Sequence, residues 1–275
     1  MNIARHLIKF LIYSNSWIGL GAAALVWQYY LIENIPTNYQ VVLLAFFATV
    51  LTYTFQRFVK IINNSPTTSE RMAWMIQHPI LIKSIMIIAL VGCVQSIYFV
   101  SFTSYILLFI TGILSLFYVV KIPIQLQKNL RDIPSLKIFL IGFVWAATGS
   151  FLPYLNLNEV SAPIPWALFF CEFLFIIAIT IPFDIRDLDL DEVDKKTIPQ
   201  MVGEKNAKII AVVLLLLTIP ILTALTHLYL FAFMGSVLCA IVLIIKSKKT
   251  AKDVYFSFLI DGLLILQPLC LFVDV

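Results

Sequence analysis

A run of acidic residues between positions 184 and 194 has the clearest chemical potential in this chain. Six of the 15 acidic residues in the 275-residue sequence lie there. On a helix that advances about 100° per residue, Asp184, Asp187 and Asp191 would share one face, within roughly 60° of each other. Converging carboxylates repel one another unless a cation or water screens them. The expected cofactor is Mg²⁺, which commonly bridges carboxylates to phosphate oxygens; the alternative is a solvated acidic loop that binds nothing.

The residues on either side of this run are apolar enough to lie in a membrane. The chain is 61% hydrophobic and 12% charged, with a mean hydropathy of +0.97. A transmembrane helix needs about 20 apolar residues, and continuous apolar runs favour helices over barrel strands. The sequence therefore predicts an all-α, polytopic membrane protein. We expect one transmembrane domain over residues 1–275, a bundle of nine helices at about 7–32, 39–59, 80–100, 102–120, 137–155, 163–183, 207–226, 228–245 and 254–273.

The positive charges indicate which connections face the cytoplasm. All 19 Lys and Arg residues lie at the amino-terminal end or in and beside every second connection. Because cytoplasmic connections are enriched in Lys and Arg, the acidic run is predicted to be cytoplasmic. The amino terminus would then be cytoplasmic and the carboxyl terminus outside. We expect an integral protein of the cytoplasmic (inner) membrane, in contact with membrane lipid and with no nucleic-acid partner.

Several polar side chains lie within the predicted spans. An acid at that depth is costly unless it faces a wet cavity or a partner, so Glu172 and Asp261 are site candidates. The alternative for each is a protonated carboxyl group that makes an interhelical hydrogen bond. The full set of pocket candidates is Asn15, Tyr53, Gln56, Tyr118, Glu172 and Asp261.

The acidic run continues into a longer motif. It reads Asp184-x-x-Asp187-x-x-x-Asp191, then Lys196-Thr197-Ile198-Pro199 and Val202-Gly203. This pattern resembles the second aspartate-rich motif of the UbiA superfamily of intramembrane prenyltransferases. Members of that family have nine transmembrane helices, with this motif between helices six and seven on the cytoplasmic side. The basic stretch from Tyr118 to Lys137 also resembles the family's connection after helix four.

The chain departs from the family at the first aspartate-rich motif. That motif, N-D-x-x-D-x-x-x-D, should lie near residues 52–64, but the first Asp of the whole chain is Asp132. The segment carries Arg57 and Lys60 instead, three residues apart near the end of a predicted helix. The resemblance therefore describes a divergent member that keeps only the second motif.

The resemblance implies a prenyltransferase. Family members transfer an isoprenyl group from an isoprenyl diphosphate to an aromatic or other apolar acceptor with the help of Mg²⁺. We hypothesise that Asp184, Asp187 and Asp191 hold a single Mg²⁺. In place of the missing motif, basic residues would bind the diphosphate directly: Arg57, Lys60, Lys121, Lys128 and Arg131. The expected partners are thus an isoprenyl diphosphate and a lipophilic acceptor.

Two other functions remain open from the sequence. Loss of the first motif is also compatible with a catalytically degenerate protein that binds an isoprenoid. A secondary transporter could use Glu172 and Asp261 as ion sites, although such transporters commonly consist of two related halves. Nine spans do not divide equally, so the sequence favours transport least.

Overall fold

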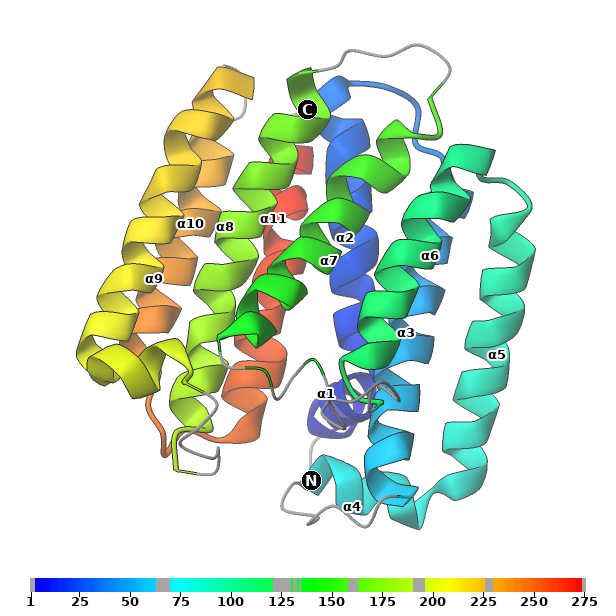
Figure 1. Ribbon diagram of the computed structural model, residues 1–275, viewed down its shortest axis with the longest axis horizontal. Coiled ribbons are helices and arrows are strands. Elements are labelled where there is room, and N and C mark those ends of the chain that lie inside the picture. Colours follow the sequence, from blue (N-terminus) through cyan, green and yellow to red (C-terminus); the bar gives the residue numbers. More distant parts are fainter. Residues whose placement is uncertain are drawn as a thin grey trace.

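The computed structural model describes residues 3–62, 70–120, 130, 133, 135–157, 163–189, 196–225 and 230–273, and these contain no β-strand. They form eleven α-helices and one π-helix, η3. In chain order these are α1 (Ile3–Tyr13), α2 (Ser16–Glu33), α3 (Tyr39–Ile62), α4 (Glu70–Gln77), α5 (Pro79–Ile97), α6 (Phe102–Phe117), α7 (Leu136–Tyr154), α8 (Pro163–Arg186), α9 (Ile198–Leu225), α10 (Leu230–Lys246), η3 (Tyr255–Ile260) and α11 (Asp261–Val273). Figure 1 shows the long helices side by side, with α1 and α4 across one end.

The helix lengths confirm a polytopic membrane protein. In the described part of the chain, α3, α5, α7, α8 and α9 are long and apolar enough to cross a bilayer. The pair α1–α2 adds a sixth span if it is counted as one broken helix. The remaining predicted spans coincide with shorter apolar helices, which are α6, α10 and the segment from Tyr255 to Leu271. Nine spans therefore stay a prediction.

The first predicted span, about 7–32, is two helices bent by 71°. The break falls at Asn15, whose φ of 63° lies in the left-handed region that Asn tolerates better than most residues. The Asn15 side chain donates a hydrogen bond to Thr54 Oγ1 of α3 at 3.0 Å. Helix α1 exposes Ile3, Leu7 and Phe10 on one face, a pattern typical of a helix that lies in the membrane interface.

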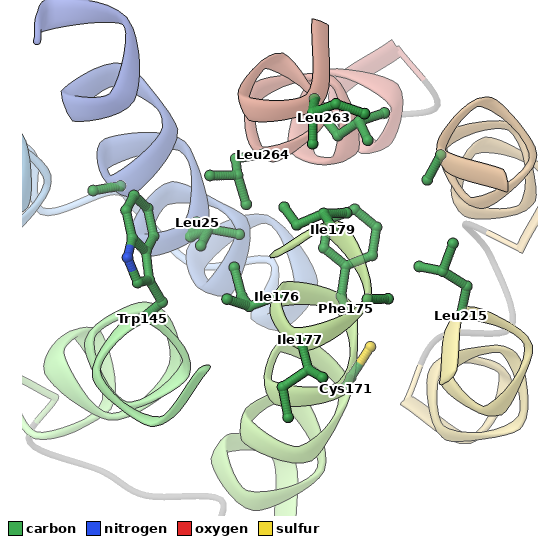
Figure 2. Close-up of a cluster of buried hydrophobic side chains, with 14 of the residues drawn as sticks. Leu25, Trp145, Cys171, Phe175, Ile176, Ile177, Ile179, Leu215, Leu263 and Leu264 are labelled. Atoms are coloured by element: carbon green, nitrogen blue, oxygen red, sulfur yellow. The ribbon is translucent and has the colours of Figure 1, made fainter. Parts of the chain in front are cut away.

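Helix α8 lies in the middle of the bundle, packed between α7 and α9. Figure 2 shows its buried side chains, including Phe175, Ile176 and Ile179, directed toward residues of α2, α9 and α11. The side chains of α5 contrast with them, because Ile87, Ile88 and many of its other apolar residues are exposed. Exposed aliphatic groups of this kind suit lipid, so α5 is a peripheral helix and α8 a central one.

Helix α5 is held against α3 by a close approach at Gly92. A Cβ atom at this position would collide with the ring of Phe47. Gly92→Ala should therefore destabilise the protein by about 1–3 kcal/mol through overpacking. The matched control is Gly235→Ala on α10, where a Cβ would meet nothing within 4 Å.

That control should gain up to about 1 kcal/mol from the higher helix propensity of Ala. Thermal unfolding of both variants in detergent measures the difference. Equal melting temperatures for the two variants would contradict this packing of α5 on α3.

Candidate functional site

A cavity of about 470 Å³ lies inside the bundle, within the range common for small-molecule sites. Its walls come from α2, α3, α4, α6, α7, α8, η3 and α11. Charged residues line one end, where α3 and α8 finish and where α4 lies. These residues, hereafter the charged end, are Arg57, Lys60, Arg71, Lys137, Arg186, Asp187, Asp253 and Asp261.

The rest of the cavity is largely apolar. Leu25, Leu152 and Ile176 line its depth, away from the charged end. Two aromatic residues, Tyr53 of α3 and Trp145 of α7, lie with their ring centroids 6.3 Å apart and nearly perpendicular. The cavity therefore suits a molecule with an apolar body and an anionic head.

Arg186 organises the acidic side of the charged end. Its guanidinium donates to Asp187 at 2.7 and 3.1 Å and to Asp253 at 2.9 Å. The same guanidinium lies 5.3 Å from the ring centroids of Phe183 and Phe256, at a cation–π distance. Arg186 thus joins the end of α8 to the segment before η3.

The helix that was expected to carry all three aspartates ends at Arg186. Asp187 consequently lies in the turn that follows, and Asp191 is outside the described residues. A physical reason is the helix dipole, because carboxylates beyond Arg186 would meet the negative end of a longer helix.

Asp184 forms a buried ion pair with Lys137 of α7. The carboxylate accepts from Lys137 Nζ at 2.6 Å, and the two side chains are only 2% and 13% exposed. Lys137 lines the cavity, whereas Asp184 lies behind it. This pair fixes α8 against α7 at the level of the charged end.

Helices α3 and α4 supply the cationic side. Arg57 and Lys60 line the cavity one helix turn apart, and Arg71 faces it from α4. Arg71 donates to the carbonyl oxygen of Ile12 in the last turn of α1, while its buried Nε has no hydrogen-bond partner among the described residues. Burial lowers the pKa of Arg71, and the carboxylates of Asp253 and Asp261 act in the opposite direction.

Most of the described residues singled out from the sequence meet at this cavity. It is lined by Tyr53, Gln56, Arg57, Lys60, Tyr118, Asp187 and Asp261. Asn15, Glu172 and Asp184 are buried but do not line it. The remaining predicted site residues, Lys121, Lys128, Arg131 and Asp191, lie outside the described part of the chain.

Glu172 is a residue of α8 whose side chain is buried inside the bundle, next to Gly149 of α7. A Cβ at Gly149 would collide with the Glu172 carboxyl group, so the missing side chain makes room for it. Neither carboxyl oxygen has a hydrogen-bond partner in the described residues. The interhelical hydrogen bond considered for Glu172 is thus not seen there.

Sequence reasoning missed four residues of the charged end: Arg71, Lys137, Arg186 and Asp253. Three of these are cations that the charge distribution assigned to cytoplasmic connections. A usable signal existed for Asp253, because Asp253, Ser257 and Asp261 recur every fourth residue and all three line the cavity.

The described residues do not form a ready-made metal centre, because no three His, Cys, Asp or Glu side chains among them gather around one point. Mg²⁺ is, however, often held by one or two carboxylates together with phosphate oxygens. Asp187 lines the cavity and could supply such a ligand. A Mg²⁺ ion that binds here together with a phosphate-bearing substrate stays a prediction.

Comparison with known proteins gives one informative similarity. No protein-family model and no curated protein matches the chain. Its fold is similar to a solved structure of digeranylgeranylglyceryl phosphate synthase in membranes, with a TM-score of 0.59 and 16% identity over 98% of both chains. At that identity the similarity shows the fold alone.

The ion pair between Lys137 and Asp184 should be essential for stability. Lys137→Met removes the cation that is paired with the buried carboxylate of Asp184, so we expect a loss of about 3–5 kcal/mol. The control is Lys83→Met, since Lys83 is exposed on α5. Denaturant unfolding in detergent provides the measurement.

A double variant, Lys137→Met with Asp184→Leu, removes both charges and should regain much of the lost stability. If Lys137→Met unfolds at the same denaturant concentration as Lys83→Met, the ion pair does not hold α7 and α8 together.

Proposed function

We propose that this protein is a membrane prenyltransferase that transfers an isoprenyl group from an isoprenyl diphosphate to a lipophilic acceptor. One observation carries the proposal: a single cavity is apolar in its depth and cationic at one end. An isoprenyl diphosphate has the same division, with an apolar chain and a strongly anionic head. The similarity of fold to a membrane prenyltransferase supports the same reaction class.

The diphosphate would lie at the charged end, against α3 and α4. Arg57 and Lys60 are placed to donate to phosphate oxygens, and Lys121, Lys128 and Arg131 are proposed as further donors from the connection after α6. Arg71 joins this set because its unpartnered Nε is buried beside the cavity. Hydrogen bonds from cations to phosphate oxygens are stronger than those between neutral groups, so they can hold the head at this depth.

Asp187 is the proposed ligand for a single Mg²⁺, with Asp191 and Asp184 as the other members of the motif. When bound, the ion would neutralise charge that develops on the departing diphosphate. Both carboxylates are ion-paired, Asp184 with Lys137 and Asp187 with Arg186, but Asp187 is the stronger candidate because it lines the cavity and Asp184 does not. Arg186 holds Asp187 from the other side and sets the direction of its carboxylate.

The transfer itself breaks the bond between the allylic carbon and the diphosphate oxygen, and the electron pair leaves with the diphosphate. The same carbon then forms a bond to the nucleophilic atom of the acceptor, which gives up a proton. The faces of Tyr53 and Trp145 are suited to stabilise the positive charge on the isoprenyl group. Asp261, which lines the cavity, is proposed to accept the proton.

A second candidate function is binding of an isoprenoid without catalysis, and one observation favours it. The ion pair between Lys137 and Asp184 occupies a carboxylate that the family motif assigns to metal binding. A catalytically degenerate protein could keep that pair permanently and still bind an isoprenoid. Incubation of the purified protein with labelled isoprenyl diphosphates and a panel of apolar acceptors, with Mg²⁺, separates the two functions. Released diphosphate with a prenylated product supports transfer, whereas binding without any product indicates the degenerate protein.

Arg57 should be important for the affinity of the donor. Arg57→Ala removes a charge-assisted hydrogen bond of about 1.5–3 kcal/mol, so the dissociation constant should rise roughly 10- to 100-fold. Titration with a labelled isoprenyl diphosphate measures it. Lys252→Ala is the matched control, because Lys252 is exposed and does not line the cavity. An unchanged affinity in Arg57→Ala would remove Arg57 from the site.

Asp261 should affect product formation rather than donor binding. Asp261→Asn has nearly the same shape but accepts a proton poorly, so turnover should fall by about 10²–10⁴-fold, the usual contribution of general base catalysis. Donor affinity should change little. Equal product formation by the variant and the wild-type protein would show that another group receives the proton.

A further inference from the structure

A layer of polar side chains lies inside the bundle, far from the charged end. It consists of Gln28 of α2, Glu172 of α8 and Gln267 of α11, and we call these three residues the polar layer. Their exposed fractions are 0%, 1% and 0%, and none of their amide or carboxyl atoms has a hydrogen-bond partner among the described residues. Buried polar groups are rarely left in this state, because nothing then compensates the lost hydration. The polar layer therefore requires a partner that the described part of the chain does not supply.

Helical register places the three residues at one level of the bundle. Leu25, Ile176 and Leu264 line the cavity, and Figure 2 shows their side chains directed toward one another between α2, α8 and α11. Helices α2 and α11 run away from the charged end, whereas α8 runs toward it (Figure 1). Three residues forward on α2 and α11, and four residues back on α8, lead to the polar layer, one helix turn further from the charged end in each case. The layer thus adjoins the deep part of the cavity.

Two prolines leave backbone carbonyl oxygens open beside this layer. A proline has no N–H, so it cannot donate to the carbonyl oxygen four residues earlier in its helix. Pro153 of α7 therefore leaves the carbonyl oxygen of Gly149 without its usual helical donor, and Pro268 of α11 does the same for Leu264. Gly149 and Leu264 both line the cavity, and the carboxyl group of Glu172 lies against Gly149. Oxygen atoms from four helices are consequently available at this level.

The helices around the polar layer carry no cation at its level. Helices α2 and α11 contain no Lys or Arg. On α7, Lys137 is twelve residues, or about 18 Å, from Gly149. On α8, Arg186 is fourteen residues, or about 21 Å, from Glu172. A protonated Glu172 would donate to a neighbouring oxygen, but neither of its carboxyl oxygens has a partner among the described residues. The layer is therefore suited to a positive charge that comes from outside the chain.

We propose that the polar layer binds a single Na⁺ ion. The ligands are the carboxylate of Glu172, the amide oxygens of Gln28 and Gln267, and the backbone carbonyl oxygens of Gly149 and Leu264. Hard cations prefer oxygen ligands, and carbonyl oxygens freed from helical hydrogen bonds coordinate Na⁺ in other membrane proteins. One carboxylate balances one positive charge, whereas a divalent ion would leave a net charge buried in the bundle. The ion joins α2, α7, α8 and α11, and this role is independent of the proposed prenyl transfer.

Binding of labelled Na⁺ to the purified wild-type protein in detergent tests the proposal, and we expect one saturable site per chain. The melting temperature should also rise by about 3–6 °C when NaCl replaces choline chloride at tenfold the dissociation constant, because the ion binds only the folded state. Both salts are compared at equal ionic strength. Absence of saturable Na⁺ binding, or equal melting temperatures in the two salts, would overturn the proposal.

A charge-removing variant assigns the site to Glu172. Glu172→Gln keeps the shape of the side chain but removes its charge, so Na⁺ binding and the rise in melting temperature should both be lost. Glu204→Gln is the matched control, because Glu204 lies on α9 with its side chain 37% exposed and paired with Lys208. This control should bind Na⁺ as the wild-type protein does.

Pro153→Ala gives a test that does not depend on the folding of Glu172→Gln. Its new N–H can donate to the carbonyl oxygen of Gly149 and compete with the ion, so the dissociation constant for Na⁺ should rise roughly 2- to 10-fold. The control is Pro220→Ala, which allows the same kind of bond within α9, away from the polar layer. Equal Na⁺ affinities in Pro153→Ala and Pro220→Ala would overturn the proposed ligand set.

Discussion

The structure depends on how charge is kept inside an apolar bundle. A charged group in a low-dielectric interior is costly unless it is paired or faces a polar cavity. The chain meets this requirement at one end of the bundle, where the Lys137–Asp184 pair and the contacts of Arg186 with Asp187 and Asp253 compensate some of the charges. The cations of α3 and α4 stand across the cavity from them. An anionic head would complete this arrangement, and for that reason the charged end defines the site.

The two sides of the cavity differ in charge. Near the end of α8 and before η3, the carboxylates of Asp184, Asp187 and Asp253 are each already paired with a cation, so these three are held in place before any substrate binds. Helix α3 carries Arg57 and Lys60 in the segment where the first aspartate-rich motif of the UbiA superfamily was expected, and α4 adds Arg71. Replacing carboxylates with cations changes the expected mode of binding, because Arg and Lys contact phosphate oxygens directly and need no metal between them. The site is thus a cationic variant of the expected arrangement.

Much of this could be predicted from the sequence, since apolar length and one-sided positive charge report on membrane helices directly. The break at Asn15 could not, because a left-handed residue inside an apolar run leaves no periodic signal, and the segment was expected to be one span. The short helix α4 and its Arg71 were missed for a similar reason: eight residues between two spans look like a connection. The motif singled out Asp184 as a metal ligand, which stays a prediction, and only the packing of α7 shows that its carboxylate is paired with Lys137.

The central claim is that the charged end recognises a diphosphate attached to an apolar chain. The most direct test compares an isoprenyl diphosphate with the alcohol of the same chain, both titrated into the wild-type protein with Mg²⁺ and with a chelator. We predict saturable binding of the diphosphate, stronger with Mg²⁺, and much weaker binding of the alcohol. Equal affinities for the two molecules under both conditions would contradict the account, because the cations of α3 and α4 would then have no part in binding.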